Sequence, residues 1–358
     1  MLSAIRVLVV DDSALIRQML TRALSMDPRI VVVGTARTGI EAIEQATSLQ
    51  PDVITLDIEM PVMTGLEALP QIRRHCTARV IVLSSVDDPD TTYRALALGA
   101  VDFIPKPSAG MASSMSELTD LLLKRIRIAN RIKPGSVTVF PHKVSEIVGV
   151  PSSGPVVASP GARLSACVAI AASTGGPPAL ERVFEGLSAA LPAAYLVVQH
   201  LPTGFSASLA RRLNALGGVC VVEAQDGMLI EAGHGYLAPH GAHMAVDVSG
   251  ASAKIVFTHE PSVHGVRPSA DVLFMSVAEA FGDMAVGVVL TGMGSDGARG
   301  AVAIKREGGD TIIQDEATSV VWGMPGSAVK LDAGKRVVPL GLVAAEIRRS
   351  IRLRTEAS

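Results

Sequence analysis

Residues 167–187 change their hydrophobic period in the middle, and this change restricts what the surrounding chain can fold into. Residues 168–172 are an apolar run of strand length, whereas the apolar residues of 179–187 recur at helical spacing. Two glycines and two prolines stand between these patterns, which suits a sharp turn followed by a first helical turn. The stretch therefore predicts a strand, a tight turn and a helix, as in a parallel α/β domain.

Ser173 directly follows this predicted strand, and three roles are open to it: a nucleophile, part of an anion-binding turn, or a helix cap. A nucleophilic serine needs a base, and the base needs an orienting carboxylate. His200 follows the apolar run 194–198, and Asp296 lies in the loop after the run 285–290. Because ligands bind outside the carboxyl ends of parallel strands, we predict that these three residues meet as a catalytic triad.

The loop that contains Asp296 also reads Gly292-Met-Gly294-Ser-Asp-Gly297, and Asp315 stands eighteen residues beyond the last glycine. This spacing is the dinucleotide-binding fingerprint, and it falls between a predicted strand and a predicted helix. A carboxylate inside that loop would repel a pyrophosphate, and the reading leaves Ser173 without a role. Dinucleotide binding is therefore kept as the alternative to hydrolysis.

Two regions of the chain alternate strand-like runs with helical patterns, which predicts two α/β domains, residues 1–130 and residues 165–358. The second is expected to be doubly wound, with a mainly parallel sheet and an antiparallel hairpin within 235–260. Between the domains, residues 131–164 contain many Pro, Gly and Ser residues and show little periodicity. We predict that this segment is a flexible linker.

Composition excludes several classes of protein. Residues 165–358 hold 15 Lys and Arg against 18 Asp and Glu, which is the opposite of the balance that phosphate contacts need. No apolar run reaches the roughly 18 residues of a membrane span, and Arg6 interrupts the first one, so no secretory signal is predicted. Three scattered cysteines fit a reducing compartment. We predict a cytoplasmic protein that does not bind nucleic acid and is not directly inserted in a membrane.

Histidines other than His200 give no clear signal. His240 and His243 are three residues apart, but no third ligand stands at a convincing metal-binding spacing. We interpret both as polar loop residues, and we extend this interpretation to His234, His259 and His264.

Polar side chains follow the predicted strands of residues 1–130 where the strands end. Asp11 and Asp12 follow the first strand, Asp57 the third, Ser84 the fourth and Lys106 the fifth. Crowded carboxylates repel one another unless a hard dication lies among them, and Mg²⁺ accepts carboxylate and phosphate oxygens. The residues at this edge of the sheet therefore predict a phosphoryl acceptor. The alternative is that they are only charged residues of the surface loops at the rim of the sheet.

The first domain resembles a response-regulator receiver domain over its full length, and the resemblance is carried by four motifs. They are Asp11-Asp12, LDIEMPVMTG at 56–65, Ser84-Ser85 and DFIPKP at 102–107. The resemblance implies a flavodoxin-like fold and a histidine kinase as the phosphodonor. It assigns the phosphoryl acceptor Asp57, the Mg²⁺ ligands Asp11, Asp12, Asp57 and the Glu59 carbonyl, and the phosphate-responsive residues Lys106, Ser84 and Phe103.

The second domain resembles the bacterial chemotaxis protein-glutamate methylesterases. Its motifs are IAASTGGPPAL, VVQHLPTGF, APHGAHM, RPSADVLF, LTGMGSDGARG and QDEATSVVWGMPGSAV. That family's catalytic triad falls on Ser173, His200 and Asp296, the residues that the strand-end argument selects independently.

The same resemblance implies the substrate, the partners and the regulation. The substrates would be glutamyl methyl esters, and for some members glutamines, on the signalling helices of methyl-accepting chemoreceptors. Hydrolysis would need no cofactor, and an unphosphorylated receiver domain would restrain it. From the glycine-rich turns we place the oxyanion donors at backbone N–H groups near Thr174 and Met293. We expect a monomer.

Overall fold

The computed structural model describes residues 4–84, 88–106, 113–132, 164–250 and 252–355. The chain divides into two compact units, Met1–Glu146 and Ile147–Ser358. Nearly all of the predicted linker 131–164 lies outside the described residues, so it stays a prediction.

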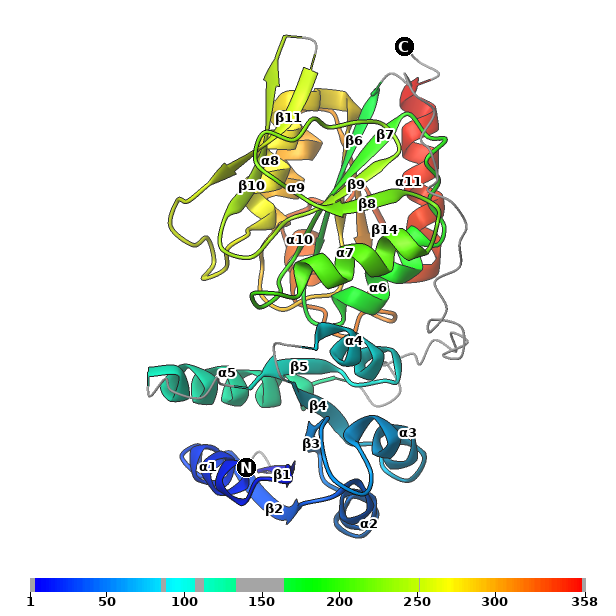
Figure 1. Ribbon diagram of the computed structural model, residues 1–358. Helices are drawn as coiled ribbons and strands as arrows, with labels where there is room; N and C mark the ends of the chain where they lie inside the picture. Colours follow the sequence, from blue (N-terminus) through cyan, green and yellow to red (C-terminus); the bar gives the residue numbers. More distant parts are fainter. Residues whose placement is uncertain (1–3, 85–87, 107–112, 133–163, 251, 356–358) are drawn as a thin grey trace. The chain divides into compact units, whose positions relative to one another are not determined.

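Five parallel strands form the sheet of the N-terminal unit, in the order β2-β1-β3-β4-β5 (Figure 1). Their bounds are β1 Ile5–Val10, β2 Ile30–Ala36, β3 Val53–Asp57, β4 Arg79–Ser84 and β5 Asp102–Pro105. This is the flavodoxin-like order, in which the chain changes direction across the sheet between β1 and β3. The acidic residues that end β1 and β3 therefore lie at that switch point.

Helices cover both faces of this sheet: α1 and α5 pack on one face, and α2, α3 and α4 on the other (Figure 1). Their bounds are α1 Ala14–Leu24, α2 Gly39–Leu49, α3 Gly65–His75, α4 Pro89–Ala97 and α5 Ser113–Ala129. The side chains of Ser13, Thr38 and Asp88 cap three of them, each by accepting a backbone N–H bond. Thr64 and Glu67 form a capping box at the start of α3.

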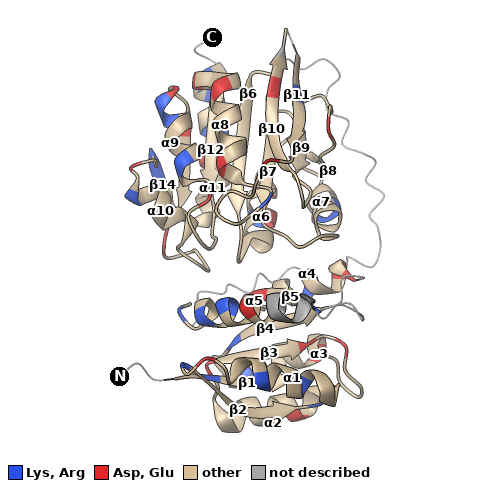
Figure 2. Ribbon diagram, turned by 90° about the vertical axis from the view of Figure 1, so that its left-hand side faces the viewer, with Lys and Arg blue, Asp and Glu red and all other residues tan. Residues whose placement is uncertain are grey.

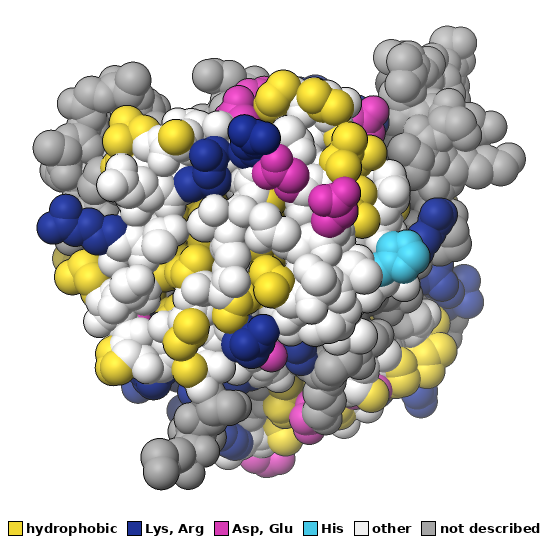
Figure 3. All heavy atoms as spheres, turned by 90° about the horizontal axis from the view of Figure 1, so that it is seen from below, with side chains coloured by type: hydrophobic (Ala, Val, Ile, Leu, Met, Phe, Trp, Pro, Cys, Tyr) yellow, Lys and Arg dark blue, Asp and Glu magenta, His cyan; other side chains and the backbone are white. Residues whose placement is uncertain are grey.

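Hydrophobic side chains on the face of this unit seen in Figure 3 form small, separate groups between acidic and basic ones. Leu15, Met26 and Val62 are among the large apolar residues that are mostly exposed in this unit. Single exposed apolar side chains are common on soluble proteins and need no partner.

The C-terminal unit contains a seven-stranded sheet in the order β14-β13-β12-β6-β7-β9-β8, and every neighbouring pair is parallel. The strands are β6 Ala166–Ala172, β7 Ala193–Gln199, β8 Cys220–Glu223, β9 His234–Leu237, β12 Ala285–Val289, β13 Asp310–Gln314 and β14 Arg336–Val338. Every residue of β6, β7 and β12 is buried, as expected for central parallel strands. The predicted doubly wound α/β class is confirmed.

Helices α6 Gly176–Phe184, α7 Ser206–Ala215 and α11 Leu340–Thr355 lie on one face of this sheet. Helices α8 Ala270–Phe281, α9 Ala298–Arg306 and α10 Met324–Lys330 lie on the other (Figure 1). Ala169 and Ala171 of β6 belong to the core on that second face, where their small side chains let α8 pack against the strand. None of the helices in the described ranges is both long and apolar enough to cross a bilayer.

Basic side chains gather along α9, α10 and β14, at one edge of this unit (Figure 2). Several of them are paired with acids. Lys305 Nζ lies 2.9 Å from Asp332 Oδ2, and Arg336 Nε lies 2.9 Å from Glu346 Oε2 and also contacts Asp310. These pairs tie α9 to the loop after α10, and β14 to α11 and β13.

The predicted antiparallel hairpin is present as β10 His243–Ser249 and β11 Ser252–Thr258. Met244 and Ile255 are buried in the core beneath α8. The hairpin occupies only part of the predicted range 235–260, because Tyr236 and Leu237 pair with β7 as part of β9. The apolar residues continue across the Pro239 to Gly241 turn, so the sequence pattern hides the point where one strand ends and the next begins.

Candidate active site

Three loops meet at the carboxyl ends of β6, β7 and β12. Strand β6 lies between β12 and β7, and the chain runs from β6 to β7 on one side before it returns to β12 on the other. Ser173 follows β6, His200 follows β7, and Asp296 lies in the loop after β12. The three residues therefore stand at the topological switch point, where ligands bind in open α/β sheets.

Ser173 does not cap helix α6. Gly175 occupies the cap position at a φ of 76°, a conformation that favours glycine, and Pro177 lies in the first helical turn as predicted. Ser173 itself is 6% exposed, and its carbonyl accepts a 2.7 Å hydrogen bond from the Gly176 N–H. Within the described ranges, no hydrogen bond joins Ser173 Oγ to His200.

The Ser173 turn is fixed to the end of β12. Ser173 N donates to the Thr291 carbonyl at 3.0 Å, and Thr291 Oγ1 donates to the Thr174 carbonyl at 3.0 Å. Gly292 packs so closely here that an added Cβ would lie 2.9 Å from the Ser173 Cβ. The first glycine of the G-x-G-x-x-G run is therefore required by the approach of two loops.

Gln199 joins the ends of β6 and β7. Its Nε2 donates to the Ser173 carbonyl at 2.9 Å and to the His200 carbonyl at 3.2 Å, while His200 N donates to the Ala172 carbonyl at 3.1 Å. Gln199 is 2% exposed. Sequence reasoning missed this residue, although a polar side chain that ends an apolar buried strand was an available signal.

His200 and Asp296 are in direct contact. His200 Nε2 lies 2.8 Å from Asp296 Oδ2, and the two side chains are 12% and 2% exposed. Asp296 also accepts hydrogen bonds from Ser269 Oγ at 2.6 Å, Ala270 N at 2.7 Å and Asp271 N at 3.0 Å. Four donors thus fix the orientation of this carboxylate.

Burial disfavours the charged form of Asp296, but the hydrogen bonds from His200, Ser269 and Ala270 outweigh it and lower the pKa of its carboxyl below the ordinary value. Asp296 is therefore ionised at neutral pH and holds the proton of His200 on Nε2. The ring nitrogen that remains available as a base is Nδ1.

Several histidines occupy positions that the sequence interpretation did not foresee. His243 is fully buried at the start of β10, where its Nδ1 accepts the Ser269 N–H at 3.0 Å and its Nε2 lies 3.2 Å from the Pro261 carbonyl. His264 Nε2 lies 2.8 Å from Asp271 Oδ2. Reading His243 as a polar loop residue was wrong, because it begins a strand and is buried against Ser269, 26 residues along the chain. His264 does lie in a turn, as expected, but its side chain has a partner at the start of α8. His240 pairs with Thr203 Oγ1 at 3.0 Å, and His234 begins β9.

The dinucleotide reading of Gly292 to Gly297 loses its support in this geometry. Asp296 is turned into the protein and bonded to His200, and Gly297 is the cap of helix α9, where an added Cβ would lie 3.1 Å from the Ala171 Cβ of β6. Asp315, the residue that would bind a ribose, accepts hydrogen bonds from Thr318 N and Oγ1 at 3.0 and 2.6 Å.

Thr174 and Met293, the predicted sources of oxyanion donors, both border Ser173. Thr174 is the next residue along the chain and is buried, whereas Met293 follows Gly292 on the loop that packs against Ser173. Their roles stay a prediction.

The polar cluster of the N-terminal unit lies at the ends of β1, β3 and β5. The ligand oxygens of Asp11, Asp12 and Asp57 lie within 4.8 Å of one another. Lys106 Nζ forms ion pairs with Asp11 Oδ2 at 3.0 Å and Asp57 Oδ2 at 2.6 Å. The Glu59 N–H donates to Asp57 Oδ1 at 3.2 Å, which places the Glu59 backbone next to the acceptor.

This cluster fits a divalent cation. Asp11 Oδ2 and Asp57 Oδ2 are buried and, among the described residues, have the ion pair with Lys106 but no aligned hydrogen bond. One ammonium cannot balance three carboxylates, and oxygen ligands of this kind suit Mg²⁺. Burial raises the pKa of Asp57 to about 6, against the opposing effect of the Lys106 ammonium. A bound dication would lower it again.

Ser84 and Phe103, the other predicted members of this site, lie on the neighbouring strands β4 and β5. Ser84 Oγ hydrogen-bonds Thr92 Oγ1 of α4, and Phe103 is buried. Ser84 therefore stands between the carboxylate cluster and α4.

The fold of each unit and the side chains at the ends of its strands together define the class of this protein. One unit has the order of a receiver domain with an acidic cluster at its switch point, and the other is a doubly wound hydrolase unit with a serine and a His-Asp pair at its own switch point.

The particular family follows from comparison with known proteins. Residues 168–347 match the family described as CheB methylesterase, and residues 7–114 match the response regulator receiver domain. The protein-glutamate methylesterase/protein-glutamine glutaminase of Pyrococcus abyssi (strain GE5 / Orsay) is 42% identical over 351 residues, 98% of this chain and 94% of that relative. The relative of the same name from Symbiobacterium thermophilum is 44% identical over 358 residues, 97% of each chain.

A solved structure agrees with these relatives. The Thermotoga maritima CheB methylesterase catalytic domain aligns with a TM-score of 0.51 at 34% identity, and covers 53% of this chain and 98% of that one. The chain therefore belongs to the protein-glutamate methylesterase/protein-glutamine glutaminase family, whose members are hydrolases that carry a receiver domain.

Proposed function

We propose that Ser173, His200 and Asp296 form a catalytic triad that hydrolyses glutamyl methyl esters on chemoreceptor signalling helices. One observation carries the proposal: the His200 to Asp296 hydrogen bond stands beside Ser173 at the switch point of a buried parallel sheet. The names of the relatives support the substrate, since they are protein-glutamate methylesterases and protein-glutamine glutaminases.

The reaction is acyl transfer in two steps. His200 Nδ1 accepts the proton of Ser173 Oγ, and the alkoxide attacks the γ-carbonyl of the substrate. When the tetrahedral intermediate collapses, the proton passes from His200 to the leaving methoxide, which departs as methanol. His200 then takes a proton from water, whose hydroxide attacks the acyl-enzyme and releases Ser173 and the glutamate. With a glutamine, ammonia leaves in place of methanol.

Asp296 orients His200 and stabilises its cation in both steps. Backbone N–H groups at Thr174 and Met293 are our candidates for stabilising the negative charge on the carbonyl oxygen. Support for them is positional, because both residues lie on the two loops that are packed together at Ser173 and Gly292.

The N-terminal unit is proposed to switch this activity. Asp57 accepts a phosphoryl group from a histidine kinase, and Lys106 and Ser84 bind the transferred group, while Phe103 moves with it. Asp11, Asp12, Asp57 and the Glu59 carbonyl would hold Mg²⁺, which neutralises the charge of the phosphoryl oxygens when bound. The buried oxygens of Asp11 and Asp57 support this assignment.

We extend the proposal to the setting of the enzyme. A receiver domain at 1–130 and a catalytic domain at 165–358, joined by a linker at 131–164, would act as a monomer in the cytoplasm. Its partners would be a chemotaxis histidine kinase and methyl-accepting chemoreceptors.

Covalent labelling tests the triad directly. A serine-directed fluorophosphonate should modify Ser173, which peptide mass spectrometry can locate, and both Ser173→Ala and His200→Ala should abolish the label. His259→Ala, which changes an exposed histidine of the same unit, is the matched control and should label at the wild-type rate. Labelling of another serine, or an undiminished label in His200→Ala, would contradict the proposed triad.

A further inference from the structure

His264 occupies the first of two positive-φ positions in a tight turn. Residues 263–266 form a two-residue turn closed by hydrogen bonds between Val263 and Val266 in both directions, at 3.2 and 3.0 Å. His264 has a φ of 54° and Gly265 a φ of 75°. Turns with two positive φ values strongly favour Asn and Gly, since side chains generally avoid this conformation. Histidine is among the non-glycine residues that adopt this conformation more often than most, so the turn accepts His264 without requiring it.

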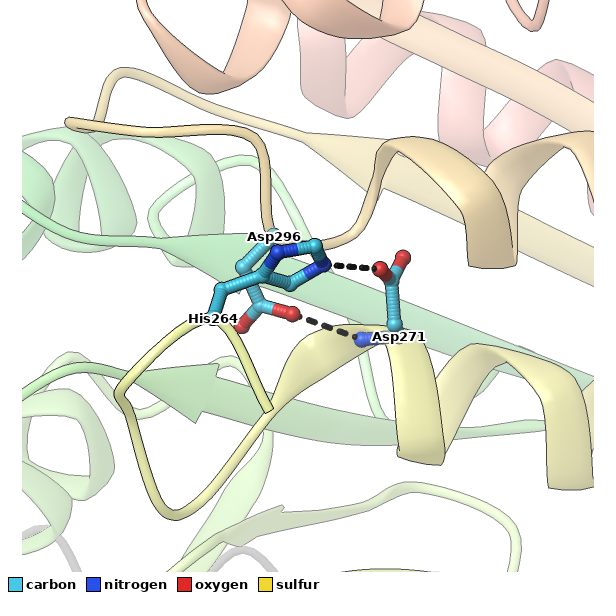
Figure 4. A group of neighbouring side chains, drawn as sticks. All are labelled: His264, Asp271 and Asp296. Carbon is cyan, nitrogen blue, oxygen red and sulfur yellow. Dashed lines mark hydrogen bonds and ion pairs between the residues drawn. The ribbon is translucent and has the colours of Figure 1, made fainter. Parts of the chain in front are cut away.

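The His264 side chain points toward the start of helix α8 (Figure 4). Its Nε2 lies 2.8 Å from Asp271 Oδ2, and the two side chains are 28% and 3% exposed. Asp271 Oδ1 accepts the Gly300 N–H of α9 at 2.7 Å. The imidazole thus offers the buried Asp271 carboxylate a donor and, when protonated, a compensating charge.

Asp271 is directly bonded to the proposed catalytic acid. Its backbone N–H donates to Asp296 Oδ1 at 3.0 Å (Figure 4). Ala270 N and Ser269 Oγ of the same helix start donate to Asp296 as well. Ligand atoms of His264, Asp271 and Asp296 lie within 4.8 Å of one another. Two buried carboxylates this close repel each other, which an imidazolium beside one of them offsets.

A metal ion is not needed to explain this group of three side chains. The Asp296 oxygens are already engaged by four donors, and both Asp271 oxygens have a donor. A continuous series of hydrogen bonds accounts for the geometry: His264 to Asp271, the start of α8 to Asp296, and Asp296 to His200.

We propose that His264 is a positioning residue of the hydrolase. By holding Asp271 it fixes the start of α8, whose three donors orient Asp296 and, through it, the ring of His200. This inference rests on the proposed triad and adds to it a fourth side chain that touches no substrate.

His264→Gly is the variant that tests this role. Glycine suits a φ of 54°, so the substitution removes the ring and relaxes the turn instead of straining it. In the full-length protein, the rate of Ser173 labelling by a small fluorophosphonate should fall by roughly 10-fold to 100-fold, the effect of a slightly misplaced catalytic group. The melting temperature should fall by only a few degrees, because the buried Asp271 carboxylate loses one of its two donors but keeps the Gly300 N–H. His259→Gly should change neither quantity.

Added imidazole supplies a second measurement. Because the His264 side chain is partly exposed, free imidazole can enter the space that His264→Gly leaves beside Asp271. Millimolar imidazole should restore part of the labelling rate of His264→Gly and leave wild type and His259→Gly unchanged. A structural role confined to the turn would give no such rescue.

The possible results separate the two proposals. If wild type is labelled at Ser173 and His264→Gly is labelled equally fast, the positioning role is wrong. A slower rate that parallels a lower melting temperature and does not respond to imidazole would also overturn it. If wild type is not labelled at Ser173 at all, the proposed triad fails first.

Discussion

Asp296 shows how a single side chain is held in one orientation before any substrate binds. Each of its two oxygens accepts two hydrogen bonds, and three of the four donors come from residues 269–271. His200 therefore meets a carboxylate whose position does not depend on His200 itself. Such an arrangement lets the imidazole take up a proton without loss of its partner.

Asp296→Asn should be severely impaired in hydrolysis. Either orientation of the amide would place its NH₂ group against a backbone N–H, Ala270 on one side or Asp271 on the other, so one hydrogen bond becomes a clash of donors. Loss of the carboxylate also favours the wrong tautomer of His200, and in a well-studied protease the equivalent change costs about 10⁴ in rate. Methanol release from methylated receptor measures the effect.

Phosphorylation of Asp57 in Asp296→Asn serves as the control and should be unaffected, since that chemistry lies in the other unit. Wild-type methanol release in this variant would move the catalytic acid elsewhere.

At the scale of elements, strand-end reasoning located the site because the sheet is parallel. Carboxyl ends of parallel strands share one edge, so an apolar run followed by a polar residue is enough to bring Ser173, His200 and Asp296 to the same rim. What the sequence could not reveal depends on packing between elements. The contacts of Gln199 with the Ser173 loop and of His243 with Ser269 join segments whose relative placement no local pattern encodes.

Gly292→Ala tests how closely the loop after β12 must approach the Ser173 turn. The new methyl group would lie 2.9 Å from the Ser173 Cβ and 2.3 Å from the Met324 sulfur, so one loop must move. We expect kcat to fall by roughly 100-fold, with a stability loss of about 1–3 kcal/mol. Steady-state kinetics and thermal melting measure the two effects.

Gly341→Ala is the matched control, since a methyl group at that position in α11 meets nothing within 4 Å. It should retain wild-type kcat and stability. Full activity in Gly292→Ala would show that the two loops can separate without cost to catalysis.

At the scale of the whole molecule, the chain combines two units with separate switch points and separate chemistry. A hydrolase needs no phosphoryl acceptor for its own reaction, so the acceptor is expected to bias an equilibrium between a less active and a more active state. A shift of a few kcal/mol is sufficient, and a dianionic phosphoryl group pulling on Lys106 and Mg²⁺ can supply it.

Five samples test this regulation by their rate of methanol release. Full-length protein should be slow alone and faster with Mg²⁺ and a small-molecule phosphodonor, and removal of Mg²⁺ by a chelator should cancel the increase. Asp57→Asn should stay slow in the presence of the donor. The fragment 165–358 should exceed the unphosphorylated parent and ignore the donor.

A fragment no faster than the unphosphorylated parent would contradict restraint by the receiver domain. Activation would then have to arise from new interactions that phosphorylation creates.

The position of β12 in the sheet has a consequence for folding while the protein is synthesised on the ribosome. Strand β12 lies directly beside β6, yet it is synthesised more than a hundred residues later. Until it emerges, the fully apolar strand β6 has one backbone edge without a partner, which is the kind of edge that recruits strands of other chains. The same late segment delivers Asp296. A chain that ends before β12 therefore exposes an aggregation-prone strand edge and also lacks Asp296, the proposed catalytic acid.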